Sequence, residues 1–349
     1  MKQRRRGFTL VELMVGLAVG LFVSVIAISV FVSTRKLQTV NASGNRMGEN
    51  ARLAFDLLHK DLRSAGFRGC AEQTSAPPAT VLSPGNGGFL DTGSSGVMGY
   101  HGTGSGFAPA LPAALNALAP APLPNSDIVS IRVPVDSLSL GLVASMAAAS
   151  AAPAIAPNIA GNTLVQSDIV MLANCNNSVI FQVTEASPTV TGVLTHGVGG
   201  SFSPGNATTD LPQKYNKGDT AVFRLQTHHY YVAPSALRPG TNSLWRLTVP
   251  GTGTGQEVAA GVDRLAISYG LDTSGSRSID RYANAATVDG AGAWDKVLST
   301  RVQMLAATTQ DNVARSAQTV QFAGSGVTAT DKRLREVLTE VVSLRSRTP

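Results

Sequence analysis

The chain has few charged and few aromatic residues. Of its 349 residues, 14% are charged and 5% are aromatic, and tryptophan occurs only at Trp245 and Trp294. Glycine and proline, by contrast, occur 35 and 18 times. A chain of this length can bury a substantial hydrophobic core. The composition favours an exported protein rich in strands and loops over a helical cytosolic enzyme.

Cysteine occurs only twice, at Cys70 and Cys175. Neither residue belongs to a Cys-x-x-Cys pair or to a cysteine–histidine spacing, which argues against a structural zinc site. In an exported protein, two cysteines are most simply explained by one disulfide, and two separate buried thiols are the alternative.

Motifs of the common catalytic sites are also missing. The sequence has no nucleophile elbow, no phosphate-binding loop and no HExxH pattern. Its one histidine cluster is HHYY at 228–231. Neighbouring side chains of a strand point to opposite faces, so His228 and His229 are not expected to share a metal. We therefore expect no enzymatic activity, no cofactor and no metal.

The segment DTSGSRSID at 272–280 has a partial calcium-loop spacing. Asp272 and Asp280 fall at the first and ninth positions of such a loop. Arg277 replaces the turn glycine, and Ala283 stands where a bidentate glutamate belongs. The segment is better interpreted as a polar hairpin loop.

The excess of positive charge is concentrated at the N-terminus. The net charge is +6, and four of the 28 basic residues are Lys2, Arg4, Arg5 and Arg6. The remaining 24 basic residues are nearly balanced by 22 acidic ones. A nucleic-acid-binding domain requires clustered cations on its folded surface, and the only later cluster lies within 332–347. We expect no nucleic-acid partner.

A long apolar run follows this basic segment. Residues 8–32 are apolar or small except for Thr9, Glu12, Ser24 and Ser29. At about 1.5 Å per residue they form a helix of roughly 37 Å, which is enough to cross a hydrocarbon core of about 30 Å. The positive-inside rule places Met1 in the cytoplasm and the rest of the chain outside. A secretory signal carries its small-residue cleavage site after the apolar run. Here Gly7 precedes the run, so cleavage at Gly7 would retain the helix.

The helix is predicted to continue beyond the membrane to about Ala65 and to end near Gly66. No proline occurs before Pro77. Apolar or small residues recur in steps of three and four, at Leu37, Val40, Gly44, Met47, Ala51, Ala54, Leu58 and Leu62. This periodicity predicts a transmembrane part at 8–32 and an amphipathic part at 33–66 that packs on a soluble domain.

Three residues inside the apolar run are candidates for contacts between helices. Gly16 and Gly20 form a GxxxG pattern, which allows helices to approach closely, although glycine is common in membrane helices in any case. Glu12 costs about 2.5–3.5 kcal/mol near the bilayer centre on insertion scales. Either it lies at the interface and reaches water, or it pairs with a positive charge. Cleavage after Gly7 would create such a charge on the Phe8 amine.

The remainder, 67–349, is predicted to be a β-rich domain, so the fold class is α+β with mostly antiparallel strands. Proline- and alanine-rich stretches at 108–125 and 144–162 are expected to be loops, with a short helix possible at 111–118. Strand-like patterns cover 128–135, 164–172, 178–185, 190–195, 220–233, 243–249, 263–272, 296–307 and 335–346.

The stretch GFTLVELMV at 7–15 resembles the N-terminal signal of type IV pilins and pseudopilins. That signal has a short basic leader ending in glycine, then phenylalanine, with glutamate as the fifth residue of the mature chain. Three further stretches resemble PilW-type minor pilins of Gram-negative bacteria: DLRSAGFRGC at 61–70, SDIVMLANCNNSVIFQVT at 167–184 and LREVLTEVVSLRSR at 334–347.

The resemblance implies a specific life history for the protein. A prepilin peptidase would remove the leader 1–7 and methylate Phe8. The protein would stand in the inner membrane with its soluble domain in the periplasm, and would be extracellular once assembled. Its expected partners are other minor pilins, the major pilin and the inner-membrane assembly machinery. The expected role is to prime or cap a type IV pilus. The alternatives are a type II secretion pseudopilin and a tip adhesin or DNA-uptake module.

Overall fold

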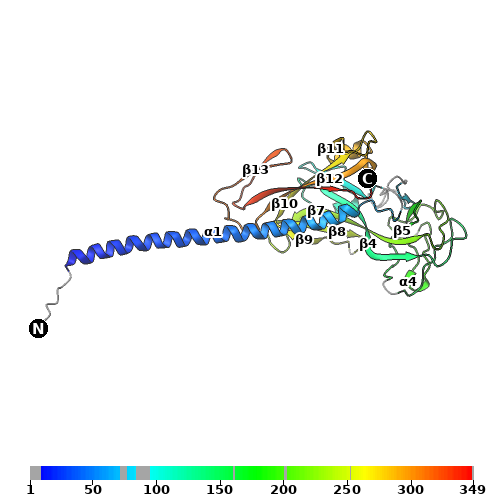
Figure 1. The fold of residues 1–349 in the computed structure, drawn as a ribbon, viewed down its shortest axis with the longest axis horizontal. Coiled ribbons are helices and arrows are strands. Elements are labelled where there is room, and N and C mark those ends of the chain that lie inside the picture. The colour runs from blue at the N-terminus through cyan, green and yellow to red at the C-terminus, as the bar shows by residue number, and fades with distance from the viewer. Residues whose placement is uncertain are drawn as a thin grey trace.

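A long helix projects from a strand-rich head, as Figure 1 shows. The computed structural model describes residues 9–70, 77–83, 95–159, 162–199, 203–251 and 253–347. Helix α1, Leu10–Ser64, begins at the free end of the projection and reaches into the head with its second half. The predicted α+β fold class is therefore confirmed.

Both ends of α1 follow from local sequence. The Thr9 side chain caps the first turn, and no proline interrupts the helix. At the other end Ala65 is the last half-helical residue, and Gly66 takes a left-handed conformation with φ +70°. Glycine favours this conformation because it has no Cβ, so Gly66 terminates the helix where the sequence predicted.

The two halves of α1 have different surroundings. Every large apolar side chain from Leu10 to Val32 is exposed, the least exposed being Ile26 at 47%. This part has the length and composition of a membrane-crossing helix. The second half buries one stripe, made of Ser43, Met47, Ala51, Ala54, Phe55, Leu58, Asp61 and Leu62. Packing starts later than predicted, because Leu37 remains 63% exposed.

Within the described residues, the larger sheet has nine strands and is built around β7, Ala221–Pro234. One long side of β7 pairs with β4, and its other side pairs first with β5 and then with β8. Only the β1–β6 pair is parallel among the described strand pairs. The other strands of this sheet are β1 (Ala79–Thr80), β2 (Val97–Gly102), β3 (Phe107–Ala108), β4 (Ile128–Gly141), β5 (Ile169–Ala173), β6 (Ser178–Gln182), β8 (Asn242–Val249) and β9 (Gln256–Ala260).

In the part of the chain that the structure describes, the smaller sheet has four antiparallel strands in the order β11-β10-β12-β15. These are β10 (Val262–Leu271), β11 (Arg281–Ala283), β12 (Val297–Ala307) and β15 (Arg335–Ser343), and a separate hairpin contains β13 (Thr319–Phe322) and β14 (Ser325–Thr328). The short helices are α3 (Ala113–Asn116), α4 (Pro188–Thr191), α5 (Ala285–Gly290) and a 3-10 turn at Trp294–Lys296.

The main core lies where α1 meets both sheets. Helix α1 contacts β4 and β9 of the larger sheet and β12 and β15 of the smaller one. Buried side chains from α1, such as Leu58 and Leu62, join Ile131, Leu265 and Val302 in one apolar cluster. Each such side chain contributes about 1.5–3 kcal/mol when fully buried, so this face holds the helix on the head.

The strand predictions hold best where apolar residues are dense. The predicted segments at 220–233, 243–249, 263–272 and 296–307 correspond closely to β7, β8, β10 and β12. The prediction of a strand over 190–195 is wrong. Pro188 begins the short helix α4 there, and Gly192, at φ +70°, ends it in a left-handed conformation.

The predicted disulfide between Cys70 and Cys175 is confirmed, with Cα atoms 4.7 Å apart and 105 residues of separation. Cys175 lies in the turn between β5 and β6 rather than within a strand. The Asn174 side chain orders this turn by accepting the backbone N–H groups of Asn176 and Asn177. The disulfide therefore ties the segment just after α1 to the β5–β6 hairpin.

The disulfide should stabilise the head. Chain-entropy arguments assign about 4–5 kcal/mol to a loop of this length, and native strain commonly lowers that value. We expect Cys70→Ser, Cys175→Ser and the double variant to lose similar free energies of unfolding and to accumulate to similarly low levels. Denaturation of the purified full chain in detergent measures this. Two free thiols, titrated in denatured protein from the native envelope, would contradict the pairing.

Candidate assembly site

The first turn of α1 is closed by a reciprocal pair of hydrogen bonds. The Glu12 backbone N–H donates to Thr9 Oγ1 over 3.2 Å, and Glu12 Oε2 accepts from the Thr9 backbone N–H over 3.0 Å. This is a capping box, in which two otherwise unpaired N–H groups are satisfied by side chains. The Thr-x-x-Glu spacing at 9–12 is the sequence signal from which this capping box could have been predicted.

The predicted charge partner of Glu12 cannot be placed. Phe8 and the cleavage residue Gly7 both lie outside the described residues. The structure therefore assigns Glu12 a role within its own helix and leaves a role between chains as a prediction. The two roles are compatible, because a carboxylate oxygen accepts more than one hydrogen bond.

The predicted packing surface of α1 is open. A methyl group added at Gly16 or Gly20 would meet nothing within 4 Å beyond the adjacent backbone of its own helix. The hydroxyl groups of the apolar half are satisfied internally, since Ser24 Oγ donates to the Gly20 carbonyl and Ser29 Oγ to the Ile26 carbonyl. Such internal bonds lower the cost of placing hydroxyl groups in lipid. Close approach of a second helix at the two glycines remains a prediction.

At the other end of α1, a buried carboxylate joins the helix to the larger sheet. Asp61 Oδ2 accepts hydrogen bonds from the Tyr230 hydroxyl and from His228 Nδ1, each at 2.6 Å. Both partners belong to β7 and lie on the same face, as alternate residues of a strand do. Burial, and then the Asp61 charge, raise the pKa of Tyr230, so its hydroxyl stays a donor at physiological pH.

The neighbouring histidine points away from this cluster, as the strand alternation predicted. His229 is buried on the opposite face, with its Nδ1 2.6 Å from the Ser130 hydroxyl. Burial, and then the nearby His228, lower the pKa of His229 to about 3. His228 and His229 therefore do not form a joint metal site.

The C-terminal segment locks the same end of α1. Ser346 Oγ donates to the Ala65 carbonyl over 2.7 Å, which satisfies a carbonyl at the end of the helix. The half-buried Arg347 side chain donates through its guanidinium to the carbonyls of Ser95, Trp294 and Val297. Burial, and then the positive charge of Arg68, lower the pKa of Arg347 to about 10.

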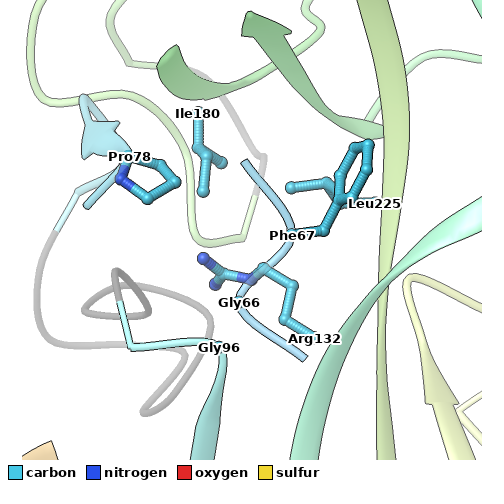
Figure 2. A pocket seen from close by; sticks show the side chains of 7 residues that line it. All are labelled: Gly66, Phe67, Pro78, Gly96, Arg132, Ile180 and Leu225. Atoms are coloured by element: carbon cyan, nitrogen blue, oxygen red, sulfur yellow. The ribbon is translucent and has the colours of Figure 1, made fainter. Parts of the chain in front are cut away.

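The chain leaves almost no space at this junction. A Cβ on Gly96 would overlap the backbone of Gly66, so the two segments can meet only because Gly96 has no side chain. Figure 2 shows the small cavity beside them, into which Arg132 extends from β4. Its volume is about 10 Å³, no more than one water molecule needs, so it is a packing gap and not a ligand site.

The polar loop at 272–280, which has a partial calcium-loop spacing, is ordered by hydrogen bonds between its own backbone and side chains. Asp272 accepts the N–H groups of Gly275, Ser276 and Arg277, and Asp280 accepts those of Thr273 and Ser274. Among the described residues, no group of three or more histidine, cysteine, aspartate or glutamate side chains is arranged to hold a metal ion.

The Asp61 cluster should contribute measurably to stability. Asp61→Ala leaves the Tyr230 hydroxyl and the His228 N–H buried without an acceptor, at about 1–3 kcal/mol for each unsatisfied group. We expect a clear loss of free energy of unfolding for Asp61→Ala and a smaller loss for Tyr230→Phe. The exposed Asp56, on the same helix, provides the matched control Asp56→Ala. Equal stabilities of Asp61→Ala and Asp56→Ala would contradict the role of the cluster.

Comparison with protein families gives two matches. Residues 229–346 match the family described as type IV pilus-assembly protein W, and residues 2–28 match the prokaryotic N-terminal methylation motif. The first region runs from the second half of β7 to the segment just after β15, and the second includes Gly7, Phe8, Glu12, Gly16 and Gly20. No curated protein and no solved structure matches the chain.

The two matches agree with the resemblance noted in the sequence at both ends of the chain. The stretches at 61–70 and 167–184 lie outside both matched regions. Neither family description names an enzyme. The chain thus resembles the PilW-type minor pilins of type IV pili in its N-terminal signal and in the strands that end its head.

Proposed function

We propose that this chain is a minor pilin that primes or caps the assembly of a type IV pilus. The observation that carries the proposal is the two-part character of α1. Its first half exposes apolar side chains on all sides, and its second half is fixed to the head. Such a helix suits a subunit that waits in the membrane and then enters a bundle of similar helices. The match to a pilus-assembly family favours a pilus over a secretion system.

The proposal includes a route through the cell envelope. The leader 1–7 holds the N-terminus in the cytoplasm and is cut after Gly7 by a prepilin peptidase, which methylates Phe8. The head folds in the periplasm, where the disulfide forms. The partners are the other minor pilins, the major pilin and the inner-membrane assembly machinery. The methylation-motif match and the apolar helix support membrane anchoring.

Within this proposal Glu12 acts twice. In the single chain it closes the capping box with Thr9. In the assembled bundle it pairs with a Phe8 amine of its own or a neighbouring subunit. A carboxylate and an amine attract strongly in a low-dielectric environment only at short range, so the pair selects the correct axial register.

One prediction of this proposal concerns removal of the leader peptide. Gly7 is the small residue at the junction of the basic leader with the helix. We expect a mature chain that begins at Phe8, and Gly7→Val should leave the longer precursor while Gly7→Ala is processed at least in part. Mass spectrometry of the native N-terminus measures both. Intact Met1–Gly7 on protein in assembled pili would rule out the proposed cleavage.

Another prediction of this proposal separates the two roles of Glu12, helix capping and pairing with an amine. Glutamine at the third helical position keeps a capping box but carries no charge. We expect Glu12→Gln and Glu12→Leu to be inserted and processed normally and to accumulate in the inner membrane. Thr9→Ala weakens the cap by about 0.5–2 kcal/mol and keeps the carboxylate, so it should enter pili nearly as well as wild type.

The measurement is the ratio of each variant in sheared pili to that in membranes. A subunit at the tip has no neighbour above it, so the defect of the Glu12 variants should be strong but can be incomplete. Wild-type incorporation of Glu12→Gln, together with failure of Thr9→Ala, would assign Glu12 to helix capping alone. If all three variants enter pili as well as wild type, Glu12 has no role in assembly and is explained as an interfacial residue that reaches water.

A further inference from the structure

The smaller sheet ends in a long, regular edge. Within the described part of the chain, β15 pairs with β12 alone, through nine consecutive residue pairs without a bulge. The other outer strands of the two sheets are protected by being short or irregular. Strands β1 and β3 have two residues each, β11 has three, and the pairing of β9 is shifted by a bulge. Natural proteins commonly blunt their edges in these ways, so β15 is the exception.

The register shows which main-chain groups of this edge are available. The Leu344 N–H donates to the Leu298 carbonyl, and the Thr308 N–H donates to the Leu334 carbonyl. Both pairs continue the β12–β15 register, so even-numbered residues of β15 direct their N–H and C=O groups toward β12. The odd-numbered residues Val337, Thr339, Val341 and Ser343 therefore direct theirs outward.

Contacts of Arg335 agree with this assignment. Its backbone N–H donates outward to Gln318 Oε1, which lies just before β13. Beyond this point no other described strand pairs with this edge, and the side chains of Thr339, Val341 and Ser343 are all exposed, Val341 to 53%. An exposed apolar side chain on a regular edge is a feature that strand-adding partners use.

A groove runs along this edge. It has a volume of about 320 Å³ and is lined by Val341, Ser343 and Arg345 on one side and by His59 and Arg63 of α1 on the other. The lining residues on the β15 side, Val341, Ser343 and Arg345, are alternate residues of the chain. This spacing is expected if their outward main-chain groups form the wall of the groove. In Figure 1, β15 is the red strand that runs beside the second half of α1 toward the C-terminus.

The groove is positively charged. It shares Arg63 and Arg345 with a larger hollow of about 580 Å³ at the end of α1, which Lys60 and Arg68 also line. Among the described residues, no acidic side chain lines either hollow. The acids of β15, Glu336 and Glu340, precede this end of the strand. The charge is therefore concentrated beside Val341 and Ser343.

We propose that β15 is a docking edge for an extended, acidic segment of another protein. The segment adds to the smaller sheet as a fifth strand, and it accepts and donates main-chain hydrogen bonds at Val337, Thr339, Val341 and Ser343. Its carboxylates lie at the end beside Arg63. Main-chain pairing supplies affinity, and the cationic wall selects acidic partners over neutral or basic ones. The inference concerns the head and does not depend on entry of α1 into a filament.

The test uses the full chain in detergent and labelled heptapeptides in which valine and threonine alternate with a varied residue. The varied residue is aspartate, asparagine or lysine, and binding is followed by fluorescence anisotropy at low salt. We expect the aspartate series to bind at least tenfold more tightly than the lysine series and to weaken as salt is added. Equal affinities for the three series, or no binding of any, would overturn the proposal.

Two pairs of variants locate the site. Val341→Pro removes an outward N–H without removing a bond to β12, so an edge strand can tolerate it. It should weaken binding of the aspartate series at least tenfold, whereas Val341→Ala, which keeps the N–H, should weaken it less than threefold. Arg63→Glu should abolish the preference for aspartate, and the exposed Arg52 provides the control Arg52→Glu. Unchanged binding by Val341→Pro or Arg63→Glu would contradict the site.

Amide hydrogen exchange gives a test that needs no variant. In the free chain, the N–H groups of Thr339, Val341 and Ser343 should exchange fast and those of the even-numbered residues slowly. A saturating aspartate peptide should slow the odd-numbered set alone. If the wild-type chain instead dimerises, with this same protection and without peptide binding, the occupant is a second copy and the acidic-partner proposal is wrong.

Discussion

One continuous helix has to satisfy two different environments. Up to Val32, α1 is apolar on every side, and its backbone groups and hydroxyls bond internally, as a lipid environment requires. From Ser43 onward, only one stripe is apolar, and it is buried between two sheets. Because no proline or bend separates the halves, the position of the head relative to the membrane is set by how the end of α1 is held.

Three connections hold that end, and each reaches a different part of the head. Asp61 bonds to β7 of the larger sheet, and the disulfide at Cys70 reaches the β5–β6 hairpin. The segment after β15, through Ser346, bonds to the end of the helix itself. Apolar burial alone would allow a helix to slide or rotate on a sheet, whereas directional bonds at one end fix its depth and rotation.

At the N-terminal end, Glu12 meets a local requirement of the helix, and the proposed pairing between chains would use the same carboxylate. The Glu12 carboxylate lies in the first turn, where N–H groups have no helical partners and the helix dipole favours negative charge. The capping box therefore lowers the cost of a charge near lipid. It also fixes the carboxylate on one side of the helix, which is the condition for pairing with a charge on another chain.

Much of this architecture could be predicted from the sequence because local patterns determine it. The apolar run, the step of three and four residues, and Gly66 together predicted where α1 lies and ends. Dense alternation of apolar and polar residues predicted β7, β8, β10 and β12. The 190–195 prediction failed because Pro188 and Gly192 favour a helical turn more strongly than the valines favour a strand.

What the sequence by itself determined was the character of each segment, because hydrophobic period and turn residues act over a few positions. It indicated a retained membrane helix, a β-rich head and two cysteines suited to one bond. Tertiary structure decided which segments meet. That Asp61 faces His228 and Tyr230, 167 and 169 residues away, follows only from how the sheet places β7 under α1. The open edge of β15 was equally beyond local patterns, because a strand's sequence does not state which neighbours it lacks.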